Sequence, residues 1–281
     1  MIHYQEEITL EDLAKAAMYS PCHALRAFCE LVGKTPFAYL RSIRLSAAAK
    51  KLRDTPVSIL EIALESAFGS HEGFTKAFSR EFAISPQRYR KEAPPLPLFS
   101  YYPVRHNGTF PEGGRNAMSS TVVFTQVIER PGRKLIIKRG IKAADYFSYC
   151  GEVGCDVWGI LESVKGAMHE SIGVWLPERM RRPGTSEYCQ AVEVPSDFSG
   201  QIPEGFEMLD LPACKYMVFH GEPFDDEAFC EAIGVVHEAI GRYNPEPFGW
   251  SWAPDDGPRF QLAPVGARGY IEGVPVRESK A

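Results

Sequence analysis

The pattern of apolar and polar residues changes partway along the chain. From residue 8 to residue 91, apolar residues recur at spacings of three and four, the period of amphipathic helices. After residue 121, runs rich in β-branched and aromatic residues alternate with helical stretches. Residues 94–120 are rich in proline and glycine and follow neither period, which is typical of a linker. The pattern therefore predicts a multidomain chain, with an all-α domain at 1–93, a linker at 94–120 and an α+β domain at 121–277.

The N-terminal pattern begins with two short helices around a tight turn. Thr9 is placed to cap the first helix, and Ser20-Pro21 restarts the chain as a second helix that Gly33 ends. This order of elements is the helix-turn-helix arrangement.

The same arrangement recurs further along. Ser58 and Glu61 have the spacing of a capping box, residues 68–69 turn the chain, and Ser70 caps a second helix. Between the two units, a helix predicted over 36–54 is roughly 28 Å long. A rigid spacer of that length places two reading helices near the roughly 34 Å that separates successive major grooves.

Residues at the turns and on the inner faces of these helices form a specific set: Leu13-Ala14, Ser20 with Arg26 and Phe28, Tyr39-Leu40-Arg41 with Arg44-Leu45, Ile62-Ala63, Phe68 with Phe74 and Phe78, and Ser85-Pro86 with Tyr89-Arg90. In these positions residues 8–91 resemble the DNA-binding domain of the AraC family of regulators. The resemblance implies that the helices beginning at Pro21 and His71 enter the major groove. The candidate DNA-contacting residues are Cys22, His23, Leu25, Arg26, Arg44, His71, Glu72, Thr75, Lys76 and Arg80.

Two departures from the family pattern and several alternatives stay open. Ala24 stands where the family usually packs a leucine, and Ala67 replaces the common glycine of the second turn. Any exposed cation on these helices has solvation as its alternative role. For Arg44, the alternatives to a phosphate contact are pairing with a glutamate and support of packing. For Glu72, the alternative to accepting a hydrogen bond from cytosine is repulsion of phosphate.

The distribution of charge agrees with a DNA-binding module. The chain has a formal net charge of −5, but residues 22–91 carry twelve lysines and arginines against six aspartates and glutamates. A positive N-terminal module beside an acidic remainder is typical of a DNA reader joined to a sensory domain.

The C-terminal pattern contains an internal duplication. Residues 131–140 align with residues 212–221 at an offset of 81, and proline, lysine and glycine coincide. Each segment precedes a helical stretch and then two strand-like runs. These lie at 153–168, 172–176 and 187–194 in the first copy, and at 225–243, 259–264 and 269–276 in the second. The sequence thus predicts two strand-helix-strand-strand repeats that form one antiparallel sheet with both helices on one face.

This pattern, with Pro203-x-Gly205-Phe206 and the closing Val274-Pro275-Val276, resembles the GyrI-like effector-binding domain over residues 121–277. The resemblance implies a pocket at the junction of the halves, lined by aromatic residues and often holding a carboxylate that attracts cationic lipophilic compounds. The candidate effector-binding residues are Trp158, Trp175, Glu187, Tyr188, Phe248, Trp250, Trp252 and Glu272. Core packing is the alternative for each aromatic residue, and a solvent-facing strand position is the alternative for each glutamate. The family's frequent Phe-Glu is here Phe260-Gln261, which leaves the cation preference open.

A hydrolase is the rival interpretation of the C-terminal domain. Residues 249–253 resemble the G-x-S-x-G nucleophile elbow but lack its last glycine and a strand-to-helix setting. Seven cysteines without a C-x-x-C pair argue against a disulfide framework or zinc site, and no cofactor motif appears. The absence of a signal peptide and of a long apolar run predicts a cytoplasmic protein with no membrane partner. The expected partners are double-stranded DNA and a small-molecule effector, with RNA polymerase as a further candidate, and the expected state is a monomer or a homodimer.

Overall fold

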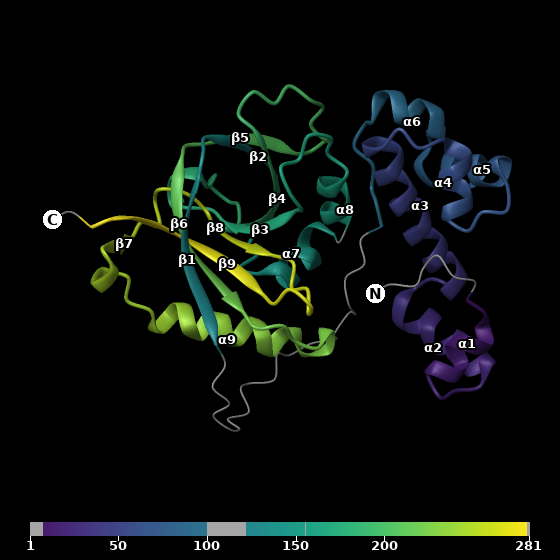
Figure 1. The fold of residues 1–281 in the computed structure, drawn as a ribbon, viewed down its shortest axis with the longest axis horizontal. Coiled ribbons are helices and arrows are strands. Elements are labelled where there is room, and N and C mark those ends of the chain that lie inside the picture. The colour runs from purple at the N-terminus through teal and green to yellow at the C-terminus, as the bar shows by residue number, and fades with distance from the viewer. Residues whose placement is uncertain (1–7, 100–121, 155, 280–281) are drawn as a thin grey trace. The chain divides into compact units, whose positions relative to one another are not determined.

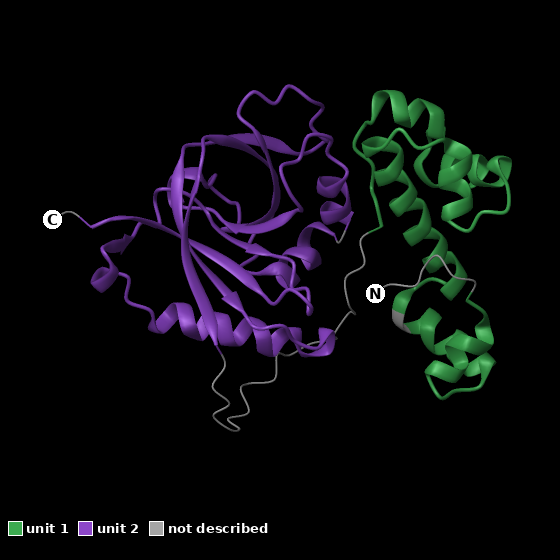
Figure 2. Ribbon diagram, viewed as in Figure 1, with its two compact units in different colours: residues 1–109 green, residues 110–281 purple. Residues whose placement is uncertain are grey.

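The computed structural model describes residues 8–99, 122–154 and 156–279 (Figure 1). It divides the chain into two compact units, Met1–Thr109 and Phe110–Ala281 (Figure 2). Each unit has its own hydrophobic core, so each is described by itself.

Unit 1 is helical throughout its described elements. They are α1 (Leu10–Ala16), α2 (Pro21–Val32), α3 (Pro36–Asp54), α4 (Ile59–Glu65), α5 (His71–Phe82) and α6 (Pro86–Glu92). Each helix begins after a serine or threonine whose side-chain oxygen accepts a backbone N–H of the first turn. The full capping box is formed by Thr9 and Asp12, whereas at Ser58 the side chain accepts from the backbone of Glu61 only.

Both helix-turn-helix turns contain a left-handed residue. Met18 has a φ of 54° between α1 and α2, and Ala67 has a φ of 55° between α4 and α5. The left-handed region is costly for a residue with a Cβ atom, which explains why glycine is common at this place. The absence of glycine leaves the turn intact and adds local strain.

The core of unit 1 forms where α3 meets the second helix-turn-helix unit. Leu45 and Leu52 of α3 pack with Ile62, Phe74 and Phe78, which are all fully or almost fully buried. Burying this many large apolar side chains against one helix fixes the directions of α4 and α5 relative to α3.

The proline-rich segment after α6 packs on the same unit. Leu96 and Leu98 are buried in this core. The backbone N–H of Phe99 donates to Oγ of Ser46 at 2.7 Å, and the Phe99 ring lies 4.8 Å from that of Tyr39. Residues 94–99, the beginning of the predicted linker, therefore belong to the packed part of unit 1. The rest of the predicted linker, residues 100–120, lies outside the described residues.

The described residues of unit 2 form one antiparallel sheet of nine strands. In spatial order the strands are β1 (Val123–Arg130), β6 (Cys214–Gly221), β9 (Ile271–Glu278), β8 (Arg259–Leu262), β3 (Ile172–Trp175), β4 (Tyr188–Pro195), β2 (Arg133–Arg139) and β5 (Glu207–Leu211), and β7 (Trp250–Trp252) pairs with β9. The α+β class and the antiparallel sheet agree with the sequence analysis, which did not predict β1, β5 or β7.

The described helices of unit 2 pack on this sheet. One of them, α9 (Phe229–Arg242), lies where a helix was predicted over 225–243. The helix predicted over 153–168 is wrong in its extent. The chain forms α7 (Tyr146–Val153) and α8 (Asp156–Glu162) instead. Gly154, with a φ of 97°, ends α7 because this backbone conformation is incompatible with a continuing helix. Short 3-10 turns lie at Glu178–Met180, Asp226–Ala228 and Glu246–Phe248.

The helices pack toward the two ends of the strand order, with the middle strands between them. Helix α9 packs on β6, and α7 and α8 pack on β4 (Figure 1). The strand register runs from Phe219 through Glu272, Gln261 and Gly173 to Gln190. Residues paired in this way share a face of the sheet. This row therefore lies on one face of the sheet and runs from the part under α9 to the part under α7, crossing the middle of the sheet at β8 and β3.

Candidate nucleic-acid interface and effector site

The second helix of each helix-turn-helix unit exposes most of the predicted DNA-contacting residues. The exposed ones are Cys22, His23 and Arg26 on α2 and His71, Glu72, Lys76 and Arg80 on α5. Leu25 and Thr75 are half-buried on the same helices, and Arg44 is half-buried on α3. The two helices thus each present a short polar face, whereas Arg44 lies on the connecting helix.

The opposite faces of these helices are fixed by packing. On α2, Ala24 is buried and the Phe28 ring lies 5.5 Å from that of Tyr39 on α3. On α5, Phe74 and Phe78 are buried in the core. Since residues three and four apart share a face of a helix, this packing turns Arg26 and Lys76 outward.

Arg26, Lys76 and Arg80 are available for an external anion. Within the described residues, none of the three has a hydrogen bond or ion pair to another side chain. A guanidinium or ammonium group in this position donates to phosphate or to the acceptor edge of guanine. The arrangement can therefore bind duplex DNA through two separate helices.

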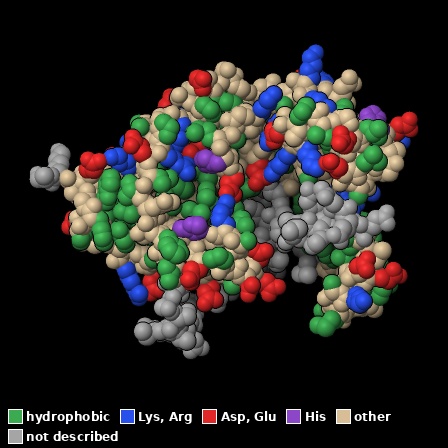
Figure 3. Space-filling model, in the orientation of Figure 1, with side chains coloured by type: hydrophobic (Ala, Val, Ile, Leu, Met, Phe, Trp, Pro, Cys, Tyr) green, Lys and Arg blue, Asp and Glu red, His purple; other side chains and the backbone are tan. Residues whose placement is uncertain are grey.

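The predicted aromatic effector residues do not form one group. Trp158 is buried on α8, where its Nε1 donates to Glu162 at 2.9 Å. Trp252 and Phe248 belong to a cluster around Tyr243 near the end of α9, in which the Tyr243 and Phe248 rings stack at 5.9 Å. Figure 3 shows hydrophobic side chains gathered on the side of unit 2 where β7 lies. Trp250 and Trp252 lie on β7, which pairs with residues 276–278 of β9, and both pack against the core that includes Phe219 and Tyr270.

Trp175 and Tyr188 lie together at the middle of the sheet. Their ring centroids are 5.1 Å apart, and Nε1 of Trp175 donates to the carbonyl of Ala144 at 2.9 Å. Glu187, the neighbour of Tyr188, pairs with Arg181 at 2.9 Å and is partly exposed. Of the two predicted carboxylates, Glu187 is thus engaged outside this group.

Glu272 is the other predicted carboxylate, and it is fully buried. Its Oε2 lies 2.9 Å from Nε2 of His237 on α9 and 3.0 Å from the hydroxyl of Tyr270, and its Oε1 accepts from Nε of Arg259. Burial by itself raises the pKa of Glu272, but the hydrogen bonds and charges of His237 and Arg259 outweigh it, so the pKa lies below its ordinary value.

Gln261 links this carboxylate to the aromatic pair. Its Nε2 donates to the Tyr188 hydroxyl at 3.0 Å, and its Oε1 lies 2.8 Å from the Tyr270 hydroxyl. Gly173 makes the approach possible, because a Cβ atom there would lie 2.3 Å from the Tyr188 hydroxyl. We call the group formed by Trp175, Tyr188, His237, Arg259, Gln261, Tyr270 and Glu272 the Glu272 cluster.

Sequence reasoning missed His237, Arg259, Gln261 and Tyr270 as members of this cluster. One signal was present: Tyr270 follows Tyr188 at nearly the offset of 81 that relates the two halves of the domain. The other three residues carry no local motif, and the sheet register and the packing of α9 bring them together.

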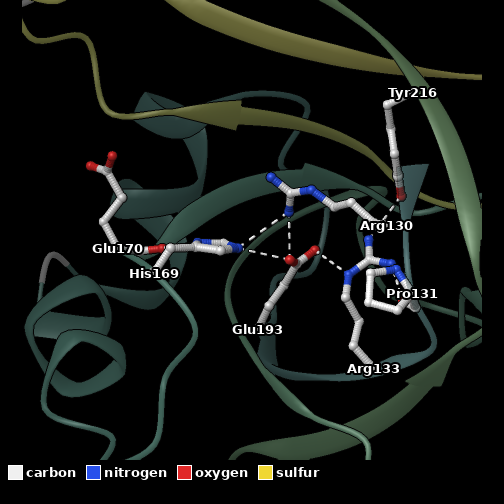
Figure 4. Close-up of polar contacts among 7 residues, drawn as sticks. All are labelled: Arg130, Pro131, Arg133, His169, Glu170, Glu193 and Tyr216. Atoms are coloured by element: carbon white, nitrogen blue, oxygen red, sulfur yellow. Dashed lines mark hydrogen bonds and ion pairs between the residues drawn. The ribbon is translucent and has the colours of Figure 1, made fainter. Parts of the chain in front are cut away.

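A second buried carboxylate, Glu193, lies on β4 and is surrounded by two arginines and a histidine (Figure 4). Its oxygens contact Arg130, Arg133 at 2.8 Å and His169 at 2.7 Å. Arg133 also donates to the Tyr216 hydroxyl at 3.1 Å. Burial raises the pKa of Glu193, but the His169 hydrogen bond and the two guanidinium charges lower it to about 2.

This network links strand β1 to strands β2 and β4, which are not its neighbours in the strand order. Strand β1 pairs with β6, β2 pairs with β4 and β5, and only residues 131–132 connect β1 to β2. Arg130 at the end of β1 and Arg133 at the start of β2 therefore both reach Glu193. The two guanidinium groups hold the halves of the sheet together, which is a structural role.

A cavity of about 350 Å³ lies elsewhere in unit 2. It is lined by Glu129, Ala213, Cys214, Lys215, Asp256, Val276, Arg277 and Glu278. Its charged walls are paired, Lys215 with Glu278 and Arg277 with Asp256. None of the predicted effector residues lines it.

The described part of the chain holds neither a metal-binding group nor a membrane-spanning helix. No group of three or more histidine, cysteine, aspartate or glutamate side chains is arranged to hold a metal ion there. Among those residues, no helix is long and apolar enough to cross a membrane.

The family model for a helix-turn-helix domain matches residues 13–92. The right origin-binding protein of Escherichia coli strain K12 is 38% identical over 108 residues, which are 38% of this chain and 37% of that protein. The HTH-type transcriptional regulator MtrA of Neisseria gonorrhoeae is 40% identical over 88 residues, which are 31% of this chain and 29% of that protein.

Among solved structures, the DNA-binding domain of AdpA in complex with a target DNA is 30% identical, covers 32% of this chain and 80% of that chain, and has a TM-score of 0.31. The matched segment spans little more than a third of the first curated relative. Residues 13–92 therefore form a helix-turn-helix domain, and the relatives that the chain matches include an HTH-type transcriptional regulator.

Proposed function

We propose that this protein is a sequence-specific transcription regulator that binds double-stranded DNA through α2 and α5. The observation that carries the proposal is the presence, on the outer faces of both helices, of cations that have no partner among the described residues, in a domain that matches the helix-turn-helix family. Arg26 acts on one helix and Lys76 on the other, and α3 sets their separation.

Selection of bound duplexes from a random pool tests this proposal. Because one chain supplies two reading helices, the expected product is a site with two conserved segments about one helical turn apart, roughly 10 base pairs. A pool that shows no enrichment after repeated rounds contradicts the proposal.

We infer that unit 2 is a GyrI-like domain built from two related halves. The strand order supports this, since β6, β9 and β8 on one side of the centre mirror β2, β4 and β3 on the other. In each half, helices follow the first of these strands: α7 and α8 follow β2, and α9 follows β6. The centre of such an arrangement lies between β8 and β3, where the Glu272 cluster is found.

We propose the Glu272 cluster as the effector site. It combines a partly exposed indole, buried tyrosines and a charged group at the junction of the two halves, which is the chemistry that holds a flat ligand. Titration of the protein with aromatic compounds, followed by tryptophan fluorescence, tests this role. The expected response is lost in Trp175→Phe and kept in Trp250→Phe, and the reverse pattern contradicts the assignment.

A catalytic role has no comparable support, and we propose none. Ser251, the serine of the elbow-like segment, has its Oγ 2.9 Å from that of Ser279 on the described chain. Among the described residues, no histidine forms a hydrogen bond with the Ser251 hydroxyl, so Ser251 does not have the general base of a serine hydrolase there. Turnover of an activated ester that Ser251→Ala abolishes would contradict this interpretation.

The remaining partners follow from the regulator role. A monomer suffices for binding, because both reading helices belong to one chain, and a homodimer is the alternative that sedimentation of the DNA complex distinguishes. Effector binding would act by shifting the equilibrium between arrangements of the two units or by altering contact with RNA polymerase. Protease cleavage within 100–120 that changes on effector addition supports the first route.

A further inference from the structure

The Glu272 cluster presents its guanidinium and its imidazole to the outside and keeps its carboxylate inside. The side chain of Glu272 is 0% exposed, whereas the side chains of Arg259 and His237 are 35% and 42% exposed. An approaching ligand therefore meets a guanidinium and an imidazole before it meets the carboxylate.

Both oxygens of this carboxylate are already engaged. Oε1 accepts from Arg259, and Oε2 lies within hydrogen-bonding distance of His237 and of the Tyr270 hydroxyl. A ligand cation would have to displace one of these groups to reach Glu272. A carboxylate that is neutralised by an internal guanidinium retains little attraction for a second cation.

Arg259, in contrast, has N–H groups that donate no hydrogen bond within the described residues. Its Nε is used by Glu272, and among the described residues its two Nη atoms donate to no acceptor. The guanidinium lies over the Trp175 ring at 4.8 Å, which orients its plane. A planar guanidinium with free Nη atoms matches the two oxygens of a carboxylate.

The other glutamate near this site does not neutralise the charge of Arg259. Glu187, the other glutamate near the aromatic pair, has its own partner in Arg181. Trp175 is partly exposed beside Arg259, so an aromatic ring has a flat surface to contact next to the free donors.

We propose that the Glu272 cluster selects an anionic aromatic ligand, a flat ring bearing a carboxylate, with the carboxylate on the Nη atoms of Arg259 and the ring against Trp175. This inference rests on the proposed effector role of the same cluster. It differs from the cation preference that the GyrI-like resemblance implies, because Arg259 here occupies the place at the carboxylate that a ligand cation would take.

Two probes with the same ring and opposite charge test the proposal on the whole protein. Naphthoate and naphthylmethylammonium are titrated separately, and binding is followed by tryptophan fluorescence. We expect naphthoate to bind at least tenfold more tightly, with a response that Trp175→Phe largely removes.

Variants of Arg259 then separate its contributions. Arg259→Gln removes the free donors and leaves Glu272 less compensated, so naphthoate should bind at least tenfold more weakly and the ammonium probe more tightly. Arg259→Lys keeps the charge without the planar group and should lose less. Arg242→Gln, which removes an exposed arginine paired with Glu238 on α9, is the matched control and should leave both affinities unchanged. Thermal melting verifies that each variant is folded.

The outcomes are distinguishable. Tighter binding of the ammonium probe by the unmodified protein overturns the ligand class and leaves the effector site in place. Naphthoate that binds folded Arg259→Gln as well as the unmodified protein overturns the role of Arg259. If neither probe changes the fluorescence at millimolar concentration, the effector role of the cluster fails, and this inference fails with it.

Discussion

Tyr188 and Tyr270 hold the same amide group: the Tyr188 hydroxyl accepts from Nε2 of Gln261 at 3.0 Å, and the Tyr270 hydroxyl lies 2.8 Å from its Oε1. Tyr188 begins β4, and Tyr270 directly precedes β9. The two tyrosines thus come from opposite sides of the sheet centre and meet at one residue of β8. Their fixed positions hold Trp175 and Glu272 on either side of the amide.

Replacing this amide should destabilise unit 2. In Gln261→Leu both buried tyrosine hydroxyls lose a partner, which is expected to lower the free energy of unfolding by about 1–3 kcal/mol. Denaturant titration measures the change. Gln126→Leu, at an exposed position of β1, is the matched control and is expected to have little effect.

Glu193 should contribute more to the free energy of unfolding than Gln261, because it is 2% exposed and contacts two arginines. Glu193→Gln leaves two guanidinium groups without their carboxylate, with an expected loss of about 3–5 kcal/mol. In the exposed pair of α6, Arg88→Ala should cost less than about 1 kcal/mol. Equal losses of stability in Glu193→Gln and Arg88→Ala would contradict the role of Glu193 in linking β1 and β2 to β4.

The same residue predicts an acid-sensitive fold. Its pKa is about 2 in the folded protein, below its usual 4.5. Stabilisation by ionised Glu193 is therefore complete above about pH 4.5 and is lost as the pH falls from 4.5 toward 2. Unfolding free energies measured across this range should fall less steeply in Glu193→Gln than in the unmodified protein.

Ala67 offers a stabilising change. Its φ of 55° is costly for a residue with a Cβ atom, and its side chain is exposed. Ala67→Gly should therefore raise the free energy of unfolding by about 1 kcal/mol. In the right-handed helix α3, Ala47→Gly should lower it by a similar amount. A thermal melt of both variants checks the opposite signs.

The packed segment after α6 should contribute to the stability of unit 1. Leu98 is 3% exposed, so Leu98→Ala is expected to cost about 2–5 kcal/mol. Its exposed neighbour gives the control, Pro97→Ala, with little change expected. An N-terminal fragment that ends at Phe99 should also melt at a higher temperature than one that ends at Ala93. Equal melting temperatures would show that residues 94–99 add no stability.

Much of unit 1 could be read from local signals. Thr9, Ser20 and Ser70 cap helices where the sequence indicated them, because a cap depends on residues within one helical turn. The packing of Leu96 and Leu98 could not be read in this way. They stand among prolines that indicate a linker, and their burial depends on α3, which lies far away in the sequence.

The candidate effector site was predicted only in part. Glu272, Trp175 and Tyr188 were identified from residue type, and the structure places them together. Phe248, Trp250 and Trp252 have the same chemistry but lie in another cluster, because β7 pairs with the outer part of β9. Residue type indicates what a side chain is able to bind, whereas its neighbours are set by the register between strands.

The affinity of the whole protein for its selected duplex tests the central claim most directly. At matched salt concentration, Arg26→Ala and Lys76→Ala should each weaken binding by about 1–3 kcal/mol if each contacts a base. Lys165→Ala, an exposed position of unit 2, should leave the affinity unchanged. Binding of the selected duplex that is no tighter than binding of a shuffled one, or that neither variant weakens, would contradict DNA recognition by α2 and α5.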